Sequence, residues 1–350
     1  MTSTELLGSS SGSRTALAVI VSYRTAELVK NLLASLARER AAEAAFGLEL
    51  RVVVVDNASG DAEPIQQAIT SAGYDGWAKV LRAPENGGFS YGNNLGFRHG
   101  FELSHVPEFF FMLNPDTEVR PGSVRALVEF FDQHPDAGIA GSSLENEDGS
   151  PWPYAFRYPS LWSELDFGLR LGVVSKLLRK HIVARLMGSV AEQVDWLPGA
   201  AMMVRRQVIE RLGGLDQTYF LYYEETDFCL KVKKAGYTVW YVPESRVMHI
   251  AGQSTGVTGF QRVAKPLPDY WFESRRRYFA KNHGLAYAVA TDAVLLVSHA
   301  LGQAKERFLK GRESPGIPRF ARDIFRHSAV HKANRSVEPS VEWRPATNPK

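Results

Sequence analysis

The sequence predicts an α/β protein with an open, doubly wound, mostly parallel sheet that has helices on both faces, followed by a helical C-terminal extension. Two observations predict this class. Short, almost continuously apolar and β-branched runs recur in the first half of the chain, as in strands buried on both faces of a parallel sheet. Between these runs lie segments with apolar residues at helical spacing. Such sheets bind ligands beyond the carboxyl ends of their strands.

The first strand, helix and strand make up the clearest unit. Residues 16–22 and 50–56 have the composition of buried strands, and residues 26–40 carry four leucines along one helical stripe. The same pattern then continues as a helix at 64–72, a strand at 78–81, a helix at 91–102, a strand at 109–113, a helix at 123–134 and a strand at 139–142.

The second half of the chain is less regular. The stretch 161–186 is helical and partly basic, and the pattern gives it no place in the fold. Residues 285–301 are apolar, but they are fewer than the ~20 residues of a membrane span and include charged Asp292, so we expect an interfacial or packed helix. The other elements expected here are a loop entering a strand at 194–206, a short helix at 207–212, a helix at 227–235, a strand at 238–242 and a helical region from Tyr270.

Composition narrows the class of protein. The 350 residues are 45% hydrophobic and 23% charged, as in an ordinary soluble globular chain. The single cysteine, Cys229, excludes a disulfide framework and a multi-thiolate zinc site, and it fits a reducing cytoplasm. Residues 1–13 lack the basic start and apolar core of an export signal and have the composition of a disordered tail.

Positive charge gathers at the C-terminal end. From Leu301 onward there are 11 Lys and Arg against 5 Asp and Glu, although the whole chain has a net charge of only +3. Such an end fits contact with a polyanion or an anionic membrane surface, and it equally fits a basic region that is merely solvated.

Five polar clusters follow predicted strands or precede predicted helices. Asp116 follows the strand at 109–113, where a carboxylate suits a divalent cation that carries phosphates, or simply a turn. Asp56 ends the strand at 50–56, where it fits a ribose hydroxyl or a pyrimidine N–H, or a helix cap. The glycine- and amide-rich run from Asn86 to Gly96 fits a diphosphate at a helix N-terminus, or a structural turn.

The remaining clusters supply acids and a histidine. Glu224, Glu225 and Asp227 begin a predicted helix beside several tyrosines, which is more acid than helix capping needs. Crowded carboxylates raise one another's pKa, as in a sheltered general base. His249 follows a predicted strand and precedes a Gly/Ser/Thr-rich segment, an arrangement that fits either a metal ligand beneath a phosphate-covering lid or an ordinary histidine.

In their order along the chain, these motifs resemble those of an inverting glycosyltransferase of family 2, with the GT-A fold, in its rhamnosyltransferase-like branch. The similarity covers roughly residues 16–283. It rests on the segments VSYR, VVVVDNAS, ENGGFSYGNNLGF, LNPDTEV, WLPGAAMMVRR, LDQTYFLYYEETDFCLKVKKAGY, H-x-x-G-x-S-T and SRRRYF.

The resemblance implies roles for particular residues. Asp116 takes the last position of the family's D-x-D metal motif, with Asn114 at the first, and His249 joins the Mg²⁺ or Mn²⁺ ion or the diphosphate. The catalytic base is Glu225, with Asp227 as the fallback. The acceptor faces Trp196, Gly199, Ala200 and Glu224, and the nucleotide sugar contacts Tyr23, Asp56, Asn57, Asn86, Gly88, Asn94 and Asn114.

One departure from the family pattern concerns the base. Members commonly have Glu-Asp-x-Asp where this chain has Glu224-Glu225-Thr226-Asp227, so Glu225 inherits the role with one extra methylene. That shift of about a bond length can lower the rate. Because of this departure, a non-catalytic carbohydrate-binding relative is an alternative interpretation of the sequence. A sugar-phosphate nucleotidyltransferase is a second alternative, but Ser22-Tyr23-Arg24-Thr25 lacks the glycine-rich loop expected after its first strand.

The resemblance completes the expected organisation. We expect disordered tails at 1–14 and 336–350, a catalytic domain at 15–268 with a nucleotide-binding half (15–145) and an acceptor half (146–268), and a basic helical region at 269–335. The implied reaction moves a sugar, L-rhamnose if the donor is dTDP-rhamnose, onto a glycan or lipid-linked acceptor for cell-surface polysaccharide. The expected location is cytoplasmic, peripheral at the inner face of the plasma membrane through the C-terminal region. No nucleic-acid partner is expected, and the oligomeric state is left open.

Overall fold

The computed structural model describes residues 14–152, 154–250, 266–310, 317–332, 340–341 and 343–346. The strands are β1 (Arg14–Ser22), β2 (Leu48–Asp56), β3 (Ala78–Arg82), β4 (Phe109–Leu113), β5 (Thr117–Val119), β6 (Ala137–Glu145), β7 (Pro151–Trp152), β8 (Tyr154–Phe156), β9 (Ala184–Leu186), β10 (Glu192–Gln193), β11 (Ala201–Arg205) and β12 (Thr238–His249). The helices are α1 (Ala26–Ala44), α2 (Ala62–Ser71), α3 (Gly88–Glu102), α4 (Ser123–Gln133), α5 (Leu161–Leu169), α6 (Gly172–Leu177), α7 (Arg206–Leu212), α8 (Glu224–Lys234), α9 (Asp269–His283), α10 (Leu285–Lys310) and α11 (Phe320–Arg326).

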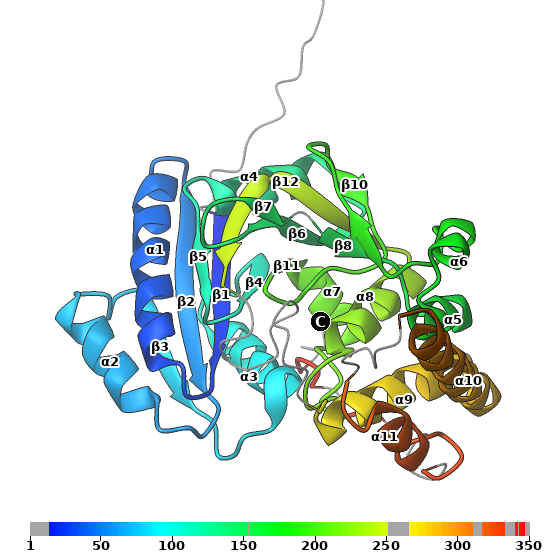
Figure 1. Ribbon diagram of the computed structural model, residues 1–350. Coiled ribbons are helices and arrows are strands. Elements are labelled where there is room, and N and C mark those ends of the chain that lie inside the picture. The colour runs from blue at the N-terminus through cyan, green and yellow to red at the C-terminus, as the bar shows by residue number, and fades with distance from the viewer. Residues whose placement is uncertain are drawn as a thin grey trace, which may run out of the picture.

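A mixed sheet forms the centre of the molecule, with strand order β10-β12-β6-β11-β4-β1-β2-β3 (Figure 1). β1 pairs in parallel with both β2 and β4, and β2 pairs in parallel with β3. β11 runs antiparallel between β4 and β6. The expected mostly parallel sheet with helices on both faces is therefore confirmed. Because Ser22 pairs with Asp56, and Ile20 with Leu113, three parallel strands end at the same edge.

Alternating residues of β1 face two separate apolar layers. Ala18 and Ile20 pack in the layer made with α1, α2 and α4, while Leu17 and Val19 pack in the layer made with α3, α7 and α8. All four side chains are at most 1% exposed. Burying a side chain of this size stabilises the fold by about 1.5–3 kcal/mol, so the alternation fixes which face each helix covers.

Glycines bring α3 close to β1. A Cβ on Gly92 would lie 2.6 Å from Val21, and one on Gly96 would lie 2.3 Å from Val19. Two of the four glycines in the Asn86–Gly96 run therefore serve helix-on-sheet packing, and the ligand-approach interpretation holds only for the start of the helix. α3 begins at Gly88, three residues before the predicted start.

The stretch 161–186, which had no predicted place, forms α5, α6 and β9. Ser160 begins α5 through a capping box with Ser163, and Arg170 ends it in the left-handed conformation. α5 packs against α10, because Gly168 allows the close approach of Ser298, to which an added Cβ would come within 1.9 Å. By length and hydropathy residues 285–308 resemble a membrane span. However, Asp292 on α10 is ion-paired with the buried Arg275 at 2.5 Å, so the packed-helix expectation fits the structure.

Three consecutive arginines of α9 lie inside the protein. Arg275, Arg276 and Arg277 are 2%, 5% and 3% exposed. Arg275 bonds Glu164 and Asp292, and Arg276 donates to a backbone carbonyl. The sequence predicted that the basic C-terminal region, which includes these arginines, contacts a membrane surface. That prediction is wrong for these three residues, because buried side chains do not face a membrane. These three arginines satisfy internal partners and leave little of their charge on the surface.

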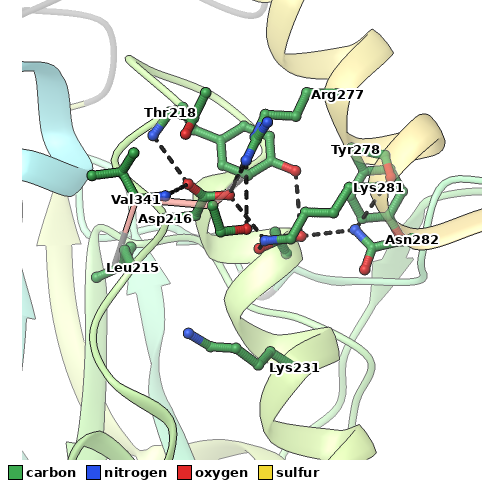
Figure 2. Close-up of polar contacts among 12 residues, drawn as sticks. Leu215, Asp216, Thr218, Lys231, Arg277, Tyr278, Lys281, Asn282 and Val341 are labelled. Carbon is green, nitrogen blue, oxygen red and sulfur yellow. Dashed lines mark hydrogen bonds and ion pairs between the residues drawn. The ribbon is translucent and has the colours of Figure 1, made fainter. Parts of the chain in front are cut away.

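Arg277 belongs to a polar cluster behind α8, shown in Figure 2. It donates to Asp216 at 2.7 Å, and Lys281 bridges Asp216 at 3.0 Å and Asp227 at 2.6 Å. Asn282 adds a hydrogen bond to Asp227 at 2.7 Å. Burial acts to raise the pKa of Asp216, but Lys281 and Arg277 outweigh it and hold this pKa well below its usual range. The cluster ties α8 to α9.

Part of the C-terminal tail also packs on the domain. Gly214 donates to the Trp343 carbonyl at 2.8 Å, and Gln217 donates to that of Val341 at 2.7 Å. The Trp343 ring lies 5.5 Å from that of Phe101. The expectation of disorder is therefore wrong for residues 340–341 and 343–346, because an apolar ring and backbone pairing fix them.

Candidate functional site

A cavity of about 370 Å³ opens at the carboxyl edge of β1, β2 and β4. Tyr23, Asn57, Asn86, Gly88 and Asn114 line it, so the structure brings together five residues expected to contact a nucleotide sugar. Val21, Phe89, Pro115, Phe220, Leu221 and Tyr270 complete its wall. We refer to it as the donor cavity.

Asn57, rather than Asp56, presents a free polar atom here. The Asp56 carboxylate accepts from Ser59 Oγ at 2.7 Å and from Ala62 N–H at 3.1 Å, and it is not among the lining residues of the donor cavity. Burial acts to raise the pKa of Asp56, and these hydrogen bonds lower it overall. Asn57 Oδ1 is buried with no hydrogen-bond partner, so an N–H of a ligand can satisfy it. In this structure Asp56 serves as a turn residue, and its expected contact with the nucleotide stays a prediction.

Asn94 does not reach the donor cavity. Its amide nitrogen donates to the carbonyl of Leu215 at 2.8 Å, and its oxygen accepts from the Leu215 N–H at 2.9 Å. Both ends of the Asn94 amide therefore hold the 213–215 loop. The prediction that Asn94 contacts the nucleotide sugar is wrong. Gly88 lies at φ +84, and a Cβ there would come within 2.0 Å of the Phe220 carbonyl. Glycine is required at this position.

Asp116 and His249 converge, although 133 residues separate them in sequence. His249 Nε2 lies 3.3 Å from Asp116 Oδ1, and Asn114 Nδ2 lies 3.4 Å from the same nitrogen. β12 extends to His249 and pairs with β5 at Thr117, which places the two side chains together. Asp116 Oδ1 is buried and accepts no hydrogen bond. The Gly/Ser/Thr segment after His249, expected to form a lid, lies outside the described residues.

The Asp116 and His249 pair fits a divalent cation. Two ligands of one octahedral ion at ~2.1 Å lie about 3 Å apart, close to the separation seen here. Within the described ranges no third His, Cys, Asp or Glu joins them to complete a metal cluster. Neither side chain lines the donor cavity; Asp116 lines a cavity of about 350 Å³ that shares Pro115 with it. Mg²⁺ commonly uses one or two protein ligands together with substrate phosphates, so the pair and a diphosphate that reaches it from the donor cavity would suffice.

Glu225 lines a second cavity of about 260 Å³, here called the acceptor cavity. Its Oε2 atom is buried without a hydrogen-bond partner, and the Gly199 N–H donates to its carboxylate. Burial raises the pKa of Glu225 to about 7, which is the range for a general base at neutral pH. The other lining residues are Pro159, Ser163, Glu164, Phe167, Val183, Trp196, Tyr222, Tyr223, Thr226, Trp271 and Leu295.

The two neighbouring acids have other surroundings. Asp227 is held by Lys281, Asn282 and the Tyr219 hydroxyl in the cluster of Figure 2, so its proposed role as the fallback base is wrong. Glu224 is 3% exposed and lines neither cavity. Burial, reinforced by Glu225, raises its pKa well above the ordinary value, and its expected contact with the acceptor stays a prediction.

The loop from Trp196 to Ala200 lies between the two cavities. Trp196 lines the acceptor cavity, stacks on Phe156 at 4.3 Å and donates from Nε1 to the Arg157 carbonyl. The Ala200 carbonyl accepts from the Asn114 N–H at 3.0 Å. A Cβ on Gly199 would come within 3.0 Å of the ring of Phe89, a donor-cavity residue. One loop therefore links the candidate base to the candidate metal site.

Several cavity residues were not foreseen. Phe220 and Tyr270 line the donor cavity, and Phe167 and Leu295 line the acceptor cavity. The aromatic run around Phe220 was a visible signal, since it adjoins the acids of α8. No sequence pattern indicated a site role for Tyr270, Phe167 or Leu295. These residues reach the two cavities only because α5, α9 and α10 pack beside them.

Comparison with known proteins agrees with this geometry. The sequence profile described as "Glycosyl transferase family 2" matches residues 17–213. N-acetylglucosaminyl-diphospho-decaprenol L-rhamnosyltransferase of Mycobacterium tuberculosis is 30% identical over 257 residues, 68% of this chain and 76% of that protein.

Solved structures share the fold. GalNAc-T7 with UDP, GalNAc and Mn²⁺ matches with a TM-score of 0.55 and 17% identity, over 91% of this chain and 58% of that one, so this chain spans little more than half of its length. Mannosyltransferase PcManGT from Pyrobaculum calidifontis, in complex with GDP-Man and Mn²⁺, matches with a TM-score of 0.50 and 16% identity, over 92% and 82%. The chain belongs to glycosyl transferase family 2, and it is a nucleotide-sugar-dependent glycosyltransferase with the GT-A fold.

Proposed function

We propose that this protein is a metal-dependent inverting transferase that moves L-rhamnose from dTDP-rhamnose onto a hydroxyl of a lipid-linked glycan. One observation carries the catalytic part of the proposal. Glu225 lines the acceptor cavity, carries a buried carboxylate oxygen without a hydrogen-bond partner, and has a pKa raised to about 7 by burial. Such a group removes a proton from a hydroxyl that is attacking a sugar.

The proposed reaction is a single displacement. The acceptor hydroxyl lies in the acceptor cavity and gives its proton to Glu225 as its oxygen forms a bond to the anomeric carbon. The bond between that carbon and the nucleoside diphosphate breaks on the opposite side, so the configuration inverts. The Gly199 N–H holds Glu225 in place, and this loop orders the donor and acceptor cavities relative to each other.

Asp116 and His249 would hold Mg²⁺ or Mn²⁺, with Asn114 beside them. Bound there, the ion supplies positive charge that offsets the charge of the departing diphosphate. Asn57 and Asn86 would contact the nucleotide, and the N-terminus of α3 at Gly88 would face the diphosphate, since helix N–H groups favour anions.

The sugar and the acceptor rest on the relative from M. tuberculosis, whose name specifies L-rhamnose and N-acetylglucosaminyl-diphospho-decaprenol. The acceptor cavity of this chain is lined mainly by apolar side chains, including Phe167, Trp271 and Leu295, which suits part of a lipid-linked substrate. A reaction of this kind places the enzyme in the cytoplasm at the inner face of the plasma membrane, in the synthesis of cell-surface polysaccharide.

Two measurements test the proposal. In a thermal-shift panel with Mn²⁺, dTDP should raise the melting temperature more than UDP or GDP, because selective binding to the native state stabilises it. Incubation with dTDP-β-L-rhamnose and N-acetylglucosaminyl-diphospho-polyprenol should then give an α-linked product by NMR. Absence of transfer with either cation, or a β-linked product, would contradict the proposal. Synthesis of a nucleotide sugar from a nucleoside triphosphate and a sugar phosphate would instead identify a nucleotidyltransferase.

A further inference from the structure

We propose that α6 and the outer face of α10 together form a surface that docks on an anionic lipid bilayer. We call it the docking surface, and it consists of Val173, Lys176, Leu177, Arg179, Lys180, Val297 and Leu301. It differs from the C-terminal basic region suggested by the sequence, whose arginines on α9 are buried. Three features of the described residues support it.

The first feature is the exposure of large apolar side chains in pairs. Val173 and Leu177 are 75% and 78% exposed, four residues apart along α6. Val297 and Leu301 are 61% and 58% exposed, with the same spacing along α10. Residues four apart lie on one side of a helix, so each pair forms an apolar ridge that the folded domain leaves uncovered. Apolar ridges of this kind insert into the headgroup boundary of a bilayer.

The second feature is charge. Between Phe167 and Glu192 the chain has five Lys and Arg residues and no Asp or Glu. Lys176, Arg179 and Lys180 are all exposed. Among the residues that the structure describes, none of these three forms an ion pair, whereas Arg170 and Arg185 of the same stretch each pair with a glutamate. Unpaired cations beside apolar ridges complement the phosphates of anionic lipids and would repel a basic partner.

The third feature is that both ridges belong to one side of the protein. α5, α6 and α10 lie together in Figure 1, and α5 packs along α10. Lys305 of α10 donates to the Leu169 carbonyl at 3.1 Å, and Glu306 approaches Arg170 at 3.6 Å. These contacts join the end of α10 to the turn that leads into α6.

The docking surface adjoins the acceptor cavity, and this step alone rests on the proposed function. Phe167 of α5 and Leu295 of α10 line that cavity, and they belong to the same two packed helices. Phe167 is also 52% exposed to the outside. A lipid-linked acceptor would therefore move from the bilayer toward Glu225 without leaving an apolar surface.

Vesicle flotation of the full-length protein, without donor or acceptor, tests the proposal directly. The wild type should float with vesicles of phosphatidylcholine containing 30% phosphatidylglycerol and stay unbound with phosphatidylcholine alone. Leu177→Asp and Lys180→Glu should each lower the bound fraction of protein at limiting lipid about tenfold. Leu301→Asp should do the same, since it interrupts the second ridge.

Phe46→Asp is the matched control for the two leucine variants, because Phe46 is 63% exposed, follows the C-terminal end of α1 and undergoes the same change of charge. It should bind as the wild type does. Hydrolysis of the sugar nucleotide in solution should be unchanged in Leu177→Asp, which separates a docking defect from misfolding or from failure of the proposed function. Equal flotation of Leu177→Asp and the wild type would overturn the proposal. So would a dimer in light scattering that Leu177→Asp converts to a monomer, since a second copy would then cover the surface.

Discussion

Replacing Glu225 by glutamine tests the catalytic geometry most directly. Glutamine keeps the length of the side chain and an oxygen that accepts from the Gly199 N–H, but it does not take up a proton. General-base catalysis typically contributes 10²–10⁴-fold, so we expect kcat to fall by about 10³ while KM changes little. The assay is the initial rate of nucleoside diphosphate release in the presence of acceptor.

The pH dependence of the wild type gives the same test a second readout. The base works deprotonated, and burial raises the pKa of Glu225 to about 7, so the rate should rise through neutral pH. Titration of one group with this pKa leaves about 10% of the maximal kcat/KM at pH 6 and about 90% at pH 8. Glu225→Asp withdraws the carboxylate by about a bond length, which can cost ~10²-fold in rate.

Glu224→Gln is the matched control, because it replaces a neighbouring buried carboxyl that lines neither cavity. Its kcat should stay within a few fold of the wild type. The reasoning is refuted if Glu225→Gln keeps more than a tenth of the wild-type kcat, or if the acid limb of the pH profile lies near the pKa of an ordinary glutamate.

Three further outcomes follow from other contacts. Asp116→Asn should weaken Mn²⁺ binding in the presence of dTDP at least tenfold by calorimetry, since the variant loses the buried anionic ligand. Lys281→Met should lower the free energy of unfolding in urea by about 2–3 kcal/mol, because Asp216 and Asp227 lose a shared cation while Arg277 still compensates one of them. Burial raises the pKa of Glu43 from the unfolded value of 4.5 to about 7 in the folded protein. Below pH 4.5 the carboxyl is protonated in both states and folding is not penalised, whereas stability is lost as pH rises through 7 and the buried carboxyl ionises. Glu43→Gln should therefore raise stability at pH 8 by roughly 1–3 kcal/mol and much less at pH 4.5.

Some of the fold and of the site was predictable because it depends on short-range pattern. Buried parallel strands have continuous apolar sequences, so β1, β2 and β4 were located within two residues. Asp116 and Asn57 follow such strands directly, and their place at the sheet edge follows from strand direction alone. Element ends were harder: α8 begins at Glu224, three residues before its predicted start.

The roles of individual polar residues were decided by tertiary structure. Asp56, Asn94 and Asp227 belong to motifs that the sequence identified, yet each carries its hydrogen bonds to a protein partner. A motif specifies residue types and spacing, whereas the direction of a side chain depends on which element packs beside it. The pairing of α9 with α8 turned Asp227 inward and left Glu225 facing the cavity.

By itself, the sequence determined the order of strands and helices in the first half of the chain, the edge of the sheet where the donor cavity opens, and the family. Only the tertiary structure decided which acid is free to act as a base, which cations are exposed, and which helices surround the acceptor cavity. The physical reason is that apolar periodicity is local to each element. Burial, pKa and unpaired hydrogen-bonding atoms instead depend on contacts between residues far apart in the chain, as between Asp116 and His249 or between Glu164 and Arg275.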